Sequence, residues 1–362
     1  MKKMLIILAV ILLLTPRVSA QSIGDGVDLA LGKVPEQITQ NLEDITELSI
    51  TELIKSPPSN IFKLMLEQAK GSVKAIASTL SMIVGIILLI TVVQCLSTGI
   101  EGTTENILQL AGCLWIIFIL SDNMASCILD GIAAILDCTR FMMSYIPVYS
   151  GVAAAAGLPA SSLIYHSTII GAGQIISQIT QNILSPLIGV FLSISVAGVI
   201  SDNKGLMNVS TAIKKSVIWL LTLMMTIFVG LVTMQSFIAG VTDLSVSKTA
   251  KFLVGSFVPV VGGVISDAVS VAKNSMGIIK ATVGSIGIVV TLLFFLPVLV
   301  KITLWRAAIF LGTLIGDIMG VEYSSKVLSA FNDTLIILTA IILSVGLLFI
   351  ISTGVILSLG VV

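Results

Sequence analysis

Charged residues are scarce in this chain. They make up only 10% of its 362 residues, against about 25% in an average soluble domain. Hydrophobic residues account for 56% of the sequence, and the mean hydropathy is +1.12. A chain of this composition cannot surround a core with a solvated surface, so the composition places the protein in a lipid bilayer.

Histidine and cysteine are also rare, with one histidine and four cysteines. Cys95, Cys113, Cys127 and Cys138 have no metal-ligand spacing and are expected to pack as small apolar side chains. His166 has no companion nucleophile, and the sequence contains no phosphate-binding loop or zinc-protease motif. The 19 basic and 19 acidic residues balance, so no nucleic-acid partner is indicated. The sequence therefore predicts no cofactor, no metal and no enzymatic activity.

The first 20 residues have the pattern of a signal peptide. Lys2 and Lys3 precede an apolar stretch at 4–14, and a small residue, Ala20, stands at the cleavage position. We expect cleavage after Ala20, which leaves the N-terminus of the mature chain outside the cytoplasm. The alternative is an uncleaved membrane anchor.

Residues 21–74 form the most polar part of the chain and are predicted to be an extracytoplasmic, amphipathic helical segment. Apolar residues recur at helical spacing between positions 38 and 48, and the prolines within 56–60 end that helix. The apolar stripe needs a partner, which is either the membrane domain or another protein.

Residues 75–362 are predicted to form an all-α transmembrane domain, a polytopic bundle of helices. Each apolar stretch is near the length of about 20 residues that crosses the hydrocarbon core. The predicted spans, about seven in all, are 76–97, 107–129, 184–200, 216–241, 281–300, 303–320 and 334–358.

Two stretches between these spans resemble each other. "SYIPVYSG" at 144–151 aligns with "SFVPVVGG" at 256–263, so we predict an internal duplication with units at about 107–200 and 216–300. Proline and glycine there would free backbone groups that cannot face lipid. Both stretches are therefore predicted to be broken or re-entrant helices inside the bundle.

The direction of the two repeats stays open at this point. Two crossings per unit make the repeats parallel, whereas three crossings make them inverted. The basic loop at 201–215 favours the parallel form by the positive-inside rule, and the lysines within 248–280 count against it.

Candidate site residues surround the two predicted breaks. The candidates for lining a path or breaking a helix are Pro147, Gly151, Pro259, Gly262, Gly263, Asp267, Lys273, Lys280, His166, Gln174 and Gln178. Two sets of polar candidates recur at helical spacing and so form a stripe along a helix, one from His166 to Gln178 and one from Lys273 to Lys280. The alternative role for these stripes is helix packing through hydrogen bonds. Asp267 is the best single candidate for a functional carboxylate, although an N-cap or interfacial role fits it at least as well. Separately, Gly312, Gly316 and Gly320 repeat every four residues and predict a close helix contact.

The signal peptide, the short acidic segment, the many spans and "SFVPVVGGVISDAV" at 256–269 together resemble the stage III sporulation protein AE family, over essentially the whole chain. The resemblance implies a multipass component of the mother-cell membrane, in a channel-like or secretion-like complex that faces the forespore. It implies a need for the protein in late forespore gene expression through sigma factor G. It also implies partners, the other proteins of the stage III sporulation A operon and stage II sporulation protein Q. The resemblance supplies no catalytic residues.

We therefore expect a permease-like part of a sporulation transport complex, with helices within 36–72 docking to partners outside the cytoplasm. Two alternatives stay open. A self-sufficient secondary transporter would need a coupling carboxylate, for which Asp267 and Asp122 are the first candidates. A membrane scaffold that only recruits the other subunits would need no polar path.

Overall fold

The computed structural model describes residues 58–96, 103–257 and 262–358. In chain order the elements are α5 (Pro58–Leu96), α6 (Thr103–Ala155), α7 (Pro159–Ile179), the π-helical turn η1 (Thr180–Leu184), α8 (Ser185–Ile200), α9 (Lys204–Phe257), α10 (Gly262–Ile318) and α11 (Glu322–Ser358). No strand occurs among these residues, which confirms the all-α fold class. The predicted signal peptide, residues 21–57 and Pro259 lie outside the described part of the chain.

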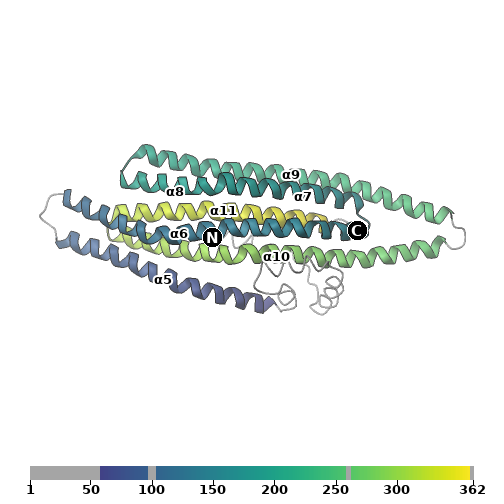
Figure 1. The fold of residues 1–362 in the computed structure, drawn as a ribbon, viewed down its shortest axis with the longest axis horizontal. Coiled ribbons are helices and arrows are strands. Elements are labelled where there is room, and N and C mark those ends of the chain that lie inside the picture. The colour runs from purple at the N-terminus through teal and green to yellow at the C-terminus, as the bar shows by residue number, and fades with distance from the viewer. Residues whose placement is uncertain (1–57, 97–102, 258–261, 359–362) are drawn as a thin grey trace.

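The helices form one elongated bundle in which α7, η1 and α8 make one continuous rod and successive rods run antiparallel (Figure 1). Helix α11 lies in the middle, and 56% of its most apolar stretch is buried, compared with 17% for α9. Helix α9 forms one edge of the bundle beside α7 and α8, and α5 lies at the opposite edge beside α10 (Figure 1). The central position of α11 explains why its sequence is apolar on nearly every side.

Six helices among the described residues are long and apolar enough to cross a membrane, compared with the predicted seven or so. The difference lies in α10, because the spans predicted at 281–300 and 303–320 are one continuous helix. Lys301, which lies between those two predicted spans, forms an ion pair with Asp130 of α6, with an Nζ–Oδ2 distance of 2.6 Å. A charge that is paired can remain inside a continuous span.

Helix α6 continues through Pro147, so the helix break predicted at this proline is wrong, and the helix ends at Ala155. Proline removes one backbone hydrogen bond from a helix. Packing on both sides of Pro147 compensates, because the buried rings of Tyr145 and Tyr149 stack with their centroids 5.5 Å apart. The Ser150 hydroxyl also donates a hydrogen bond of 2.9 Å to the Pro147 carbonyl.

Three short turns reverse the chain with one hydrogen-bond pattern, at 156–158, 201–203 and 319–321. In the last of them the N–H of Val321 bonds to the Gly316 carbonyl at 3.0 Å, and the N–H of Gly320 bonds to the Asp317 carbonyl at 3.3 Å. This pattern is a Schellman motif, which needs a residue with positive φ after the helix. Gly320, with φ of 73°, and Gly157, with φ of 92°, supply that conformation. Gly320 therefore ends α10 and does not belong to the predicted glycine contact face.

Helices α6, α9 and α10 are unusually long, with 53, 54 and 57 residues. At 1.5 Å per residue each is about 80 Å long, whereas the hydrocarbon core of a bilayer is about 30 Å thick. These helices therefore continue well outside the hydrocarbon. Helices α9 and α10 also extend past the start of α7 and the end of α11 (Figure 1).

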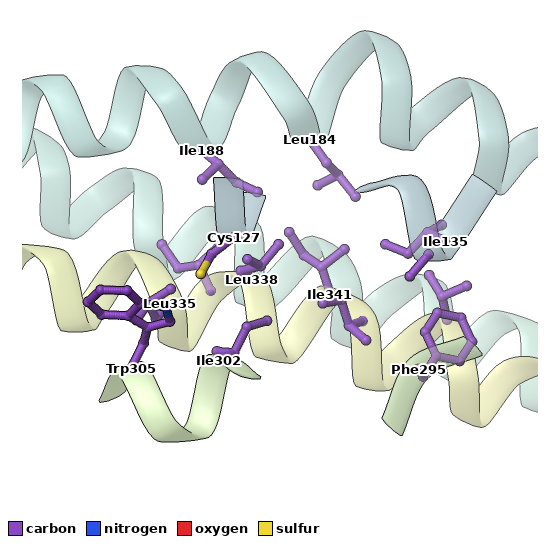
Figure 2. Packing of buried hydrophobic residues seen from close by; sticks show 14 of the residues in the cluster. Cys127, Ile135, Leu184, Ile188, Phe295, Ile302, Trp305, Leu335, Leu338 and Ile341 are labelled. Atoms are coloured by element: carbon purple, nitrogen blue, oxygen red, sulfur yellow. The ribbon is translucent and has the colours of Figure 1, made fainter. Parts of the chain in front are cut away.

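Large apolar side chains fill the space between α11 and its neighbours. Figure 2 shows Leu335, Leu338 and Ile341 of α11 between side chains of α6, of η1 and α8, and of α10. These surrounding residues are Cys127, Ile135, Leu184, Ile188, Phe295, Ile302 and Trp305, all of them buried. The centre of the bundle is thus a packed core.

Candidate functional site

The predicted lining residues of α7 lie on two different faces. Gln174 and Gln178 are exposed on the outer surface of the bundle. His166 is half-buried next to α6, with its Nδ1 atom 3.3 Å from the Ser150 hydroxyl oxygen. The two amides therefore face away from the interior, and the histidine joins α7 to α6.

On α6, Pro147 and Gly151 are both exposed and lie one turn apart. Around the second predicted break, Gly262 and Gly263 begin α10. The side chains of Asp267 and Lys273 lie outside what the structure describes, as does Pro259.

Lys280 on α10 is buried and binds the end of α11. Its Nζ atom donates a hydrogen bond of 3.3 Å to the carbonyl oxygen of Ile356, in the last turn of that helix. Carbonyl groups at a helix C-terminus lack partners within the helix, and a cation is favoured there by the helix dipole. The predicted lining residue Lys280 therefore caps α11.

A carboxylate caps the start of α7 at the same end of the bundle. Asp243 of α9 is buried, and its two carboxylate oxygens accept hydrogen bonds from the backbone N–H groups of Ala160 at 2.8 Å and Ser161 at 3.0 Å. The residue before the helix, Leu158, has no side-chain acceptor. A carboxylate from α9 therefore takes the place of a local N-cap.

Three tyrosines join four helices near these caps. The ring of Tyr165 on α7 lies edge-on to that of Tyr149 on α6, with centroids 5.6 Å apart. The Tyr145 hydroxyl donates a hydrogen bond of 2.7 Å to the Val283 carbonyl of α10. The Tyr165 hydroxyl lies 3.3 Å from the Thr353 hydroxyl of α11. The Tyr149 hydroxyl has no hydrogen-bond partner among the described residues.

Two glycines of α10 provide the room for these rings. A Cβ atom on Gly287 would lie 2.5 Å from the Tyr145 ring, and one on Gly284 would lie 2.6 Å from the Tyr149 hydroxyl oxygen. The sequence reasoning missed the tyrosines. The available signal was the spacing of Tyr145 and Tyr149 within "SYIPVYSG", because residues four apart share a helix face.

A small cavity lies between α7, α9 and α11, beside Tyr165. Its volume is about 20 Å³, and polar groups of Ser161, Gln235 and Ser352 are among those that line it. The Thr168 hydroxyl donates a hydrogen bond of 2.5 Å to the Gln235 amide oxygen at its wall. A cavity of this volume holds about one water molecule.

The glycines predicted to form a helix contact divide between packing and the turn. A Cβ atom on Gly312 would lie 3.3 Å from Leu328 of α11 and 3.5 Å from Ile83 of α5, and one on Gly316 would lie 3.5 Å from the Ser325 Cβ atom. Gly312 and Gly316 thus both face neighbouring helices, with a tight approach at Gly312 and an ordinary contact distance at Gly316.

The described residues contain no group of three His, Cys, Asp or Glu side chains that could hold a metal ion. Three of the cysteines, Cys113, Cys127 and Cys138, are buried, and Cys95 is exposed.

Residues 40–360 match the family model of Stage III sporulation protein AE, a range that includes every described helix. This chain belongs to the stage III sporulation protein AE family. Stage III sporulation protein AE of Bacillus subtilis (strain 168) is 26% identical to it over 227 residues, which are 63% of this chain and 57% of the relative. The match therefore spans little more than half of that relative's length. No solved structure matches the chain. As a member of the stage III sporulation protein AE family, the chain is a sporulation protein, and the six apolar helices among its described residues make it a membrane protein.

Proposed function

We propose that this chain is a multipass component of a channel-like or secretion-like complex in the mother-cell membrane facing the forespore, and that late forespore sigma factor G activity requires it. Membership of the stage III sporulation protein AE family supports the sporulation role, and the six apolar helices in the described part of the chain support the membrane location. The proposed partners are the other proteins of the stage III sporulation A operon and stage II sporulation protein Q.

The placement of polar groups favours a subunit of a complex over a self-sufficient transporter. The cavity beside Tyr165 has room for about one water molecule, whereas Gln174 and Gln178 face outward. Asp122, a candidate coupling carboxylate, is exposed, and Asp243 is engaged in capping α7. The two amides therefore do not line a path through the interior of this chain.

The six-helix arrangement is compatible with an extracytoplasmic N-terminus. With that orientation the turns at 201–203 and 319–321 lie on the cytoplasmic side, and the turn at 156–158 lies on the outer side. The lysines within 204–215 then follow the positive-inside rule. Helices α6 and α9 run in the same direction (Figure 1), as the parallel form of the predicted duplication requires. The duplication itself stays a prediction.

Complementation of a deletion strain of the native host tests this proposal. The strain receives the wild-type gene or the double variant Asp267→Ala/Lys273→Ala, and a sigma factor G reporter is measured in the forespore. Lys280 is left unchanged because it caps α11. Protein amount in the membrane and co-purification of the other stage III proteins serve as controls.

We expect no reporter activity without the gene, and loss of activity in the double variant at normal protein amount and normal co-purification. Normal reporter activity in the deletion strain would contradict the proposed function. Normal activity in the double variant alone would favour the scaffold, which needs no polar path.

A further inference from the structure

The outer face of α7 and η1 carries a row of amide side chains, which we call the amide stripe. Gln174, Gln178, Gln181 and Asn182 are all exposed, and their spacing places them on one side of the helix. Small residues continue the same outer face along α8. They are Gly189, Ser193 and Ala197, which are exposed and four residues apart.

The neighbouring helix shows that the amide stripe lies at the level of the hydrocarbon. Two contacts between α7 and α9, Asp243 with Ala160 and Gln235 with Thr168, set the register of these antiparallel helices. In that register Gln178 lies level with Met225 of α9. Around this level α9 exposes large apolar side chains, with Leu223 at 40%, Ile227 at 59% and Leu231 at 43%. A belt of this kind faces lipid acyl chains.

The backbone of the stripe is polar as well. In η1 the N–H of Ser185 bonds to the Thr180 carbonyl, five residues back, and so is not available to the Gln181 carbonyl. Pro186 has no N–H to give to the Asn182 carbonyl. Amide side chains and freed carbonyl groups at hydrocarbon depth are costly unless protein or water covers them. π-Helical turns of this kind occur frequently at functional sites.

We propose that the amide stripe is an interface with a second copy of this chain. A carboxamide both donates and accepts hydrogen bonds, so a row of them is complementary to the same row on an identical chain. The four side chains are uncharged and require no partner of opposite charge. The small residues at 189, 193 and 197 allow the two α8 helices to approach closely, as small residues four apart do in paired membrane helices.

Disulfide trapping tests this interface in a bacterial host that does not sporulate and has none of the proposed partners. Ser193→Cys and, separately, Gln178→Cys are made with Cys95→Ala, because Cys95 is exposed whereas the other three cysteines are buried. Thr226→Cys on the lipid-facing side of α9 is the matched control, since Thr226 is likewise an exposed hydroxyl residue that bonds to its own helix. Membranes are oxidised, and linked dimers are measured on non-reducing gels.

We expect dimers at Ser193→Cys or Gln178→Cys in several-fold excess over the Thr226→Cys control. In the Ser193→Cys background, Gln174→Leu/Gln178→Leu should lower the dimer yield several-fold, and Gln178→Asn should lower it less. Linkage no greater than at the control, or a yield unchanged by the leucines, would overturn the proposal.

Labelling with a membrane-impermeant maleimide examines the other occupants of the stripe. We expect Gln178→Cys to be protected in the unoxidised membranes. Rapid labelling would show that water covers the stripe, and rapid labelling that becomes slow only when the other stage III proteins are co-expressed would show that a partner protein covers it. Either result would overturn the proposal. The disulfide trapping uses the chain alone, so its outcome does not depend on the proposed sporulation role.

Discussion

The Tyr145 hydroxyl donates a hydrogen bond of 2.7 Å to the Val283 carbonyl, a residue 138 positions further along the chain. This contact fastens α6 to α10 just before Pro147. Tyr149, just after the proline, stacks on Tyr145 and lies against Tyr165. Tertiary packing on both sides of the proline thus holds a helix that its sequence alone would interrupt.

Replacing Tyr145 with phenylalanine should destabilise the protein, and the same change at Tyr149 should not. Tyr145→Phe loses a buried hydrogen bond, which costs about 0.5–1.5 kcal/mol. Tyr149→Phe removes a hydroxyl that has no hydrogen-bond partner among the described residues, so we expect an equal or slightly higher melting temperature. Thermal unfolding in detergent measures both variants. Equal losses from the two would contradict the assigned contacts.

Gly287→Ala should separate α6 from α10. The added Cβ atom would lie 2.5 Å from the Tyr145 ring, and overpacking of this kind costs about 1–3 kcal/mol. Gly277→Ala on the same helix is the matched control, because a Cβ atom there meets nothing within 4 Å. We expect a lower melting temperature for Gly287→Ala and no loss for Gly277→Ala. A harmless Gly287→Ala would show that the close contact does not form.

Asp243→Ala should destabilise the start of α7. The variant leaves the buried N–H groups of Ala160 and Ser161 without their acceptors, and a buried donor without a partner costs about 1–3 kcal/mol. Asp243→Asn keeps one acceptor oxygen and should lose less. Asp122→Ala, at an exposed carboxylate, is the control and should change stability by less than about 0.5 kcal/mol. Denaturant unfolding of the purified proteins ranks the variants by their free energy of unfolding. A lower stability for Asp122→Ala than for Asp243→Ala would reject the capping role.

Single cysteines in the Cys95→Ala background should report the sidedness of the bundle. Ser201→Cys and Ile318→Cys lie at one end of the bundle, and Ala155→Cys lies at the other, all at exposed positions. We expect an impermeant maleimide added to intact cells to label Ala155→Cys, and the other two only after the cells are opened. The reverse pattern would place the N-terminus of α5 in the cytoplasm, and labelling of all three from outside would exclude the six-helix topology.

Composition and hydropathy were sufficient to predict the helical membrane class, because a bilayer leaves few other ways to satisfy the backbone. The number of membrane-spanning helices was harder to predict from the sequence. Lys301 lies between two predicted spans, and only its ion pair with Asp130 shows how one continuous helix carries this charge. Pro147 likewise resembled a helix break, because the tyrosines that stabilise α6 around it do so by contacts with α7 and α10. In both cases the deciding partner lies far away in the sequence.

The periodicity of polar residues placed Gln174 and Gln178 on one side of a helix but could not indicate what covers that side. Periodicity reports which residues share a face, whereas the neighbour of that face depends on how the helices assemble. Lys280 illustrates the same limit. Its sequence context gave no sign that the end of a helix 76 residues away would receive its ammonium group.

The two helix caps made by distant residues form late during synthesis of the chain. The carboxylate of Asp243 is made 83 residues after Ala160, so the first turn of α7 enters the membrane before its acceptor exists. Lys280 in turn precedes Ile356, the residue whose carbonyl it binds. This end of the protein therefore closes only after α11 has been synthesised, and a truncation before α11 would leave Lys280 without the helix end that it caps.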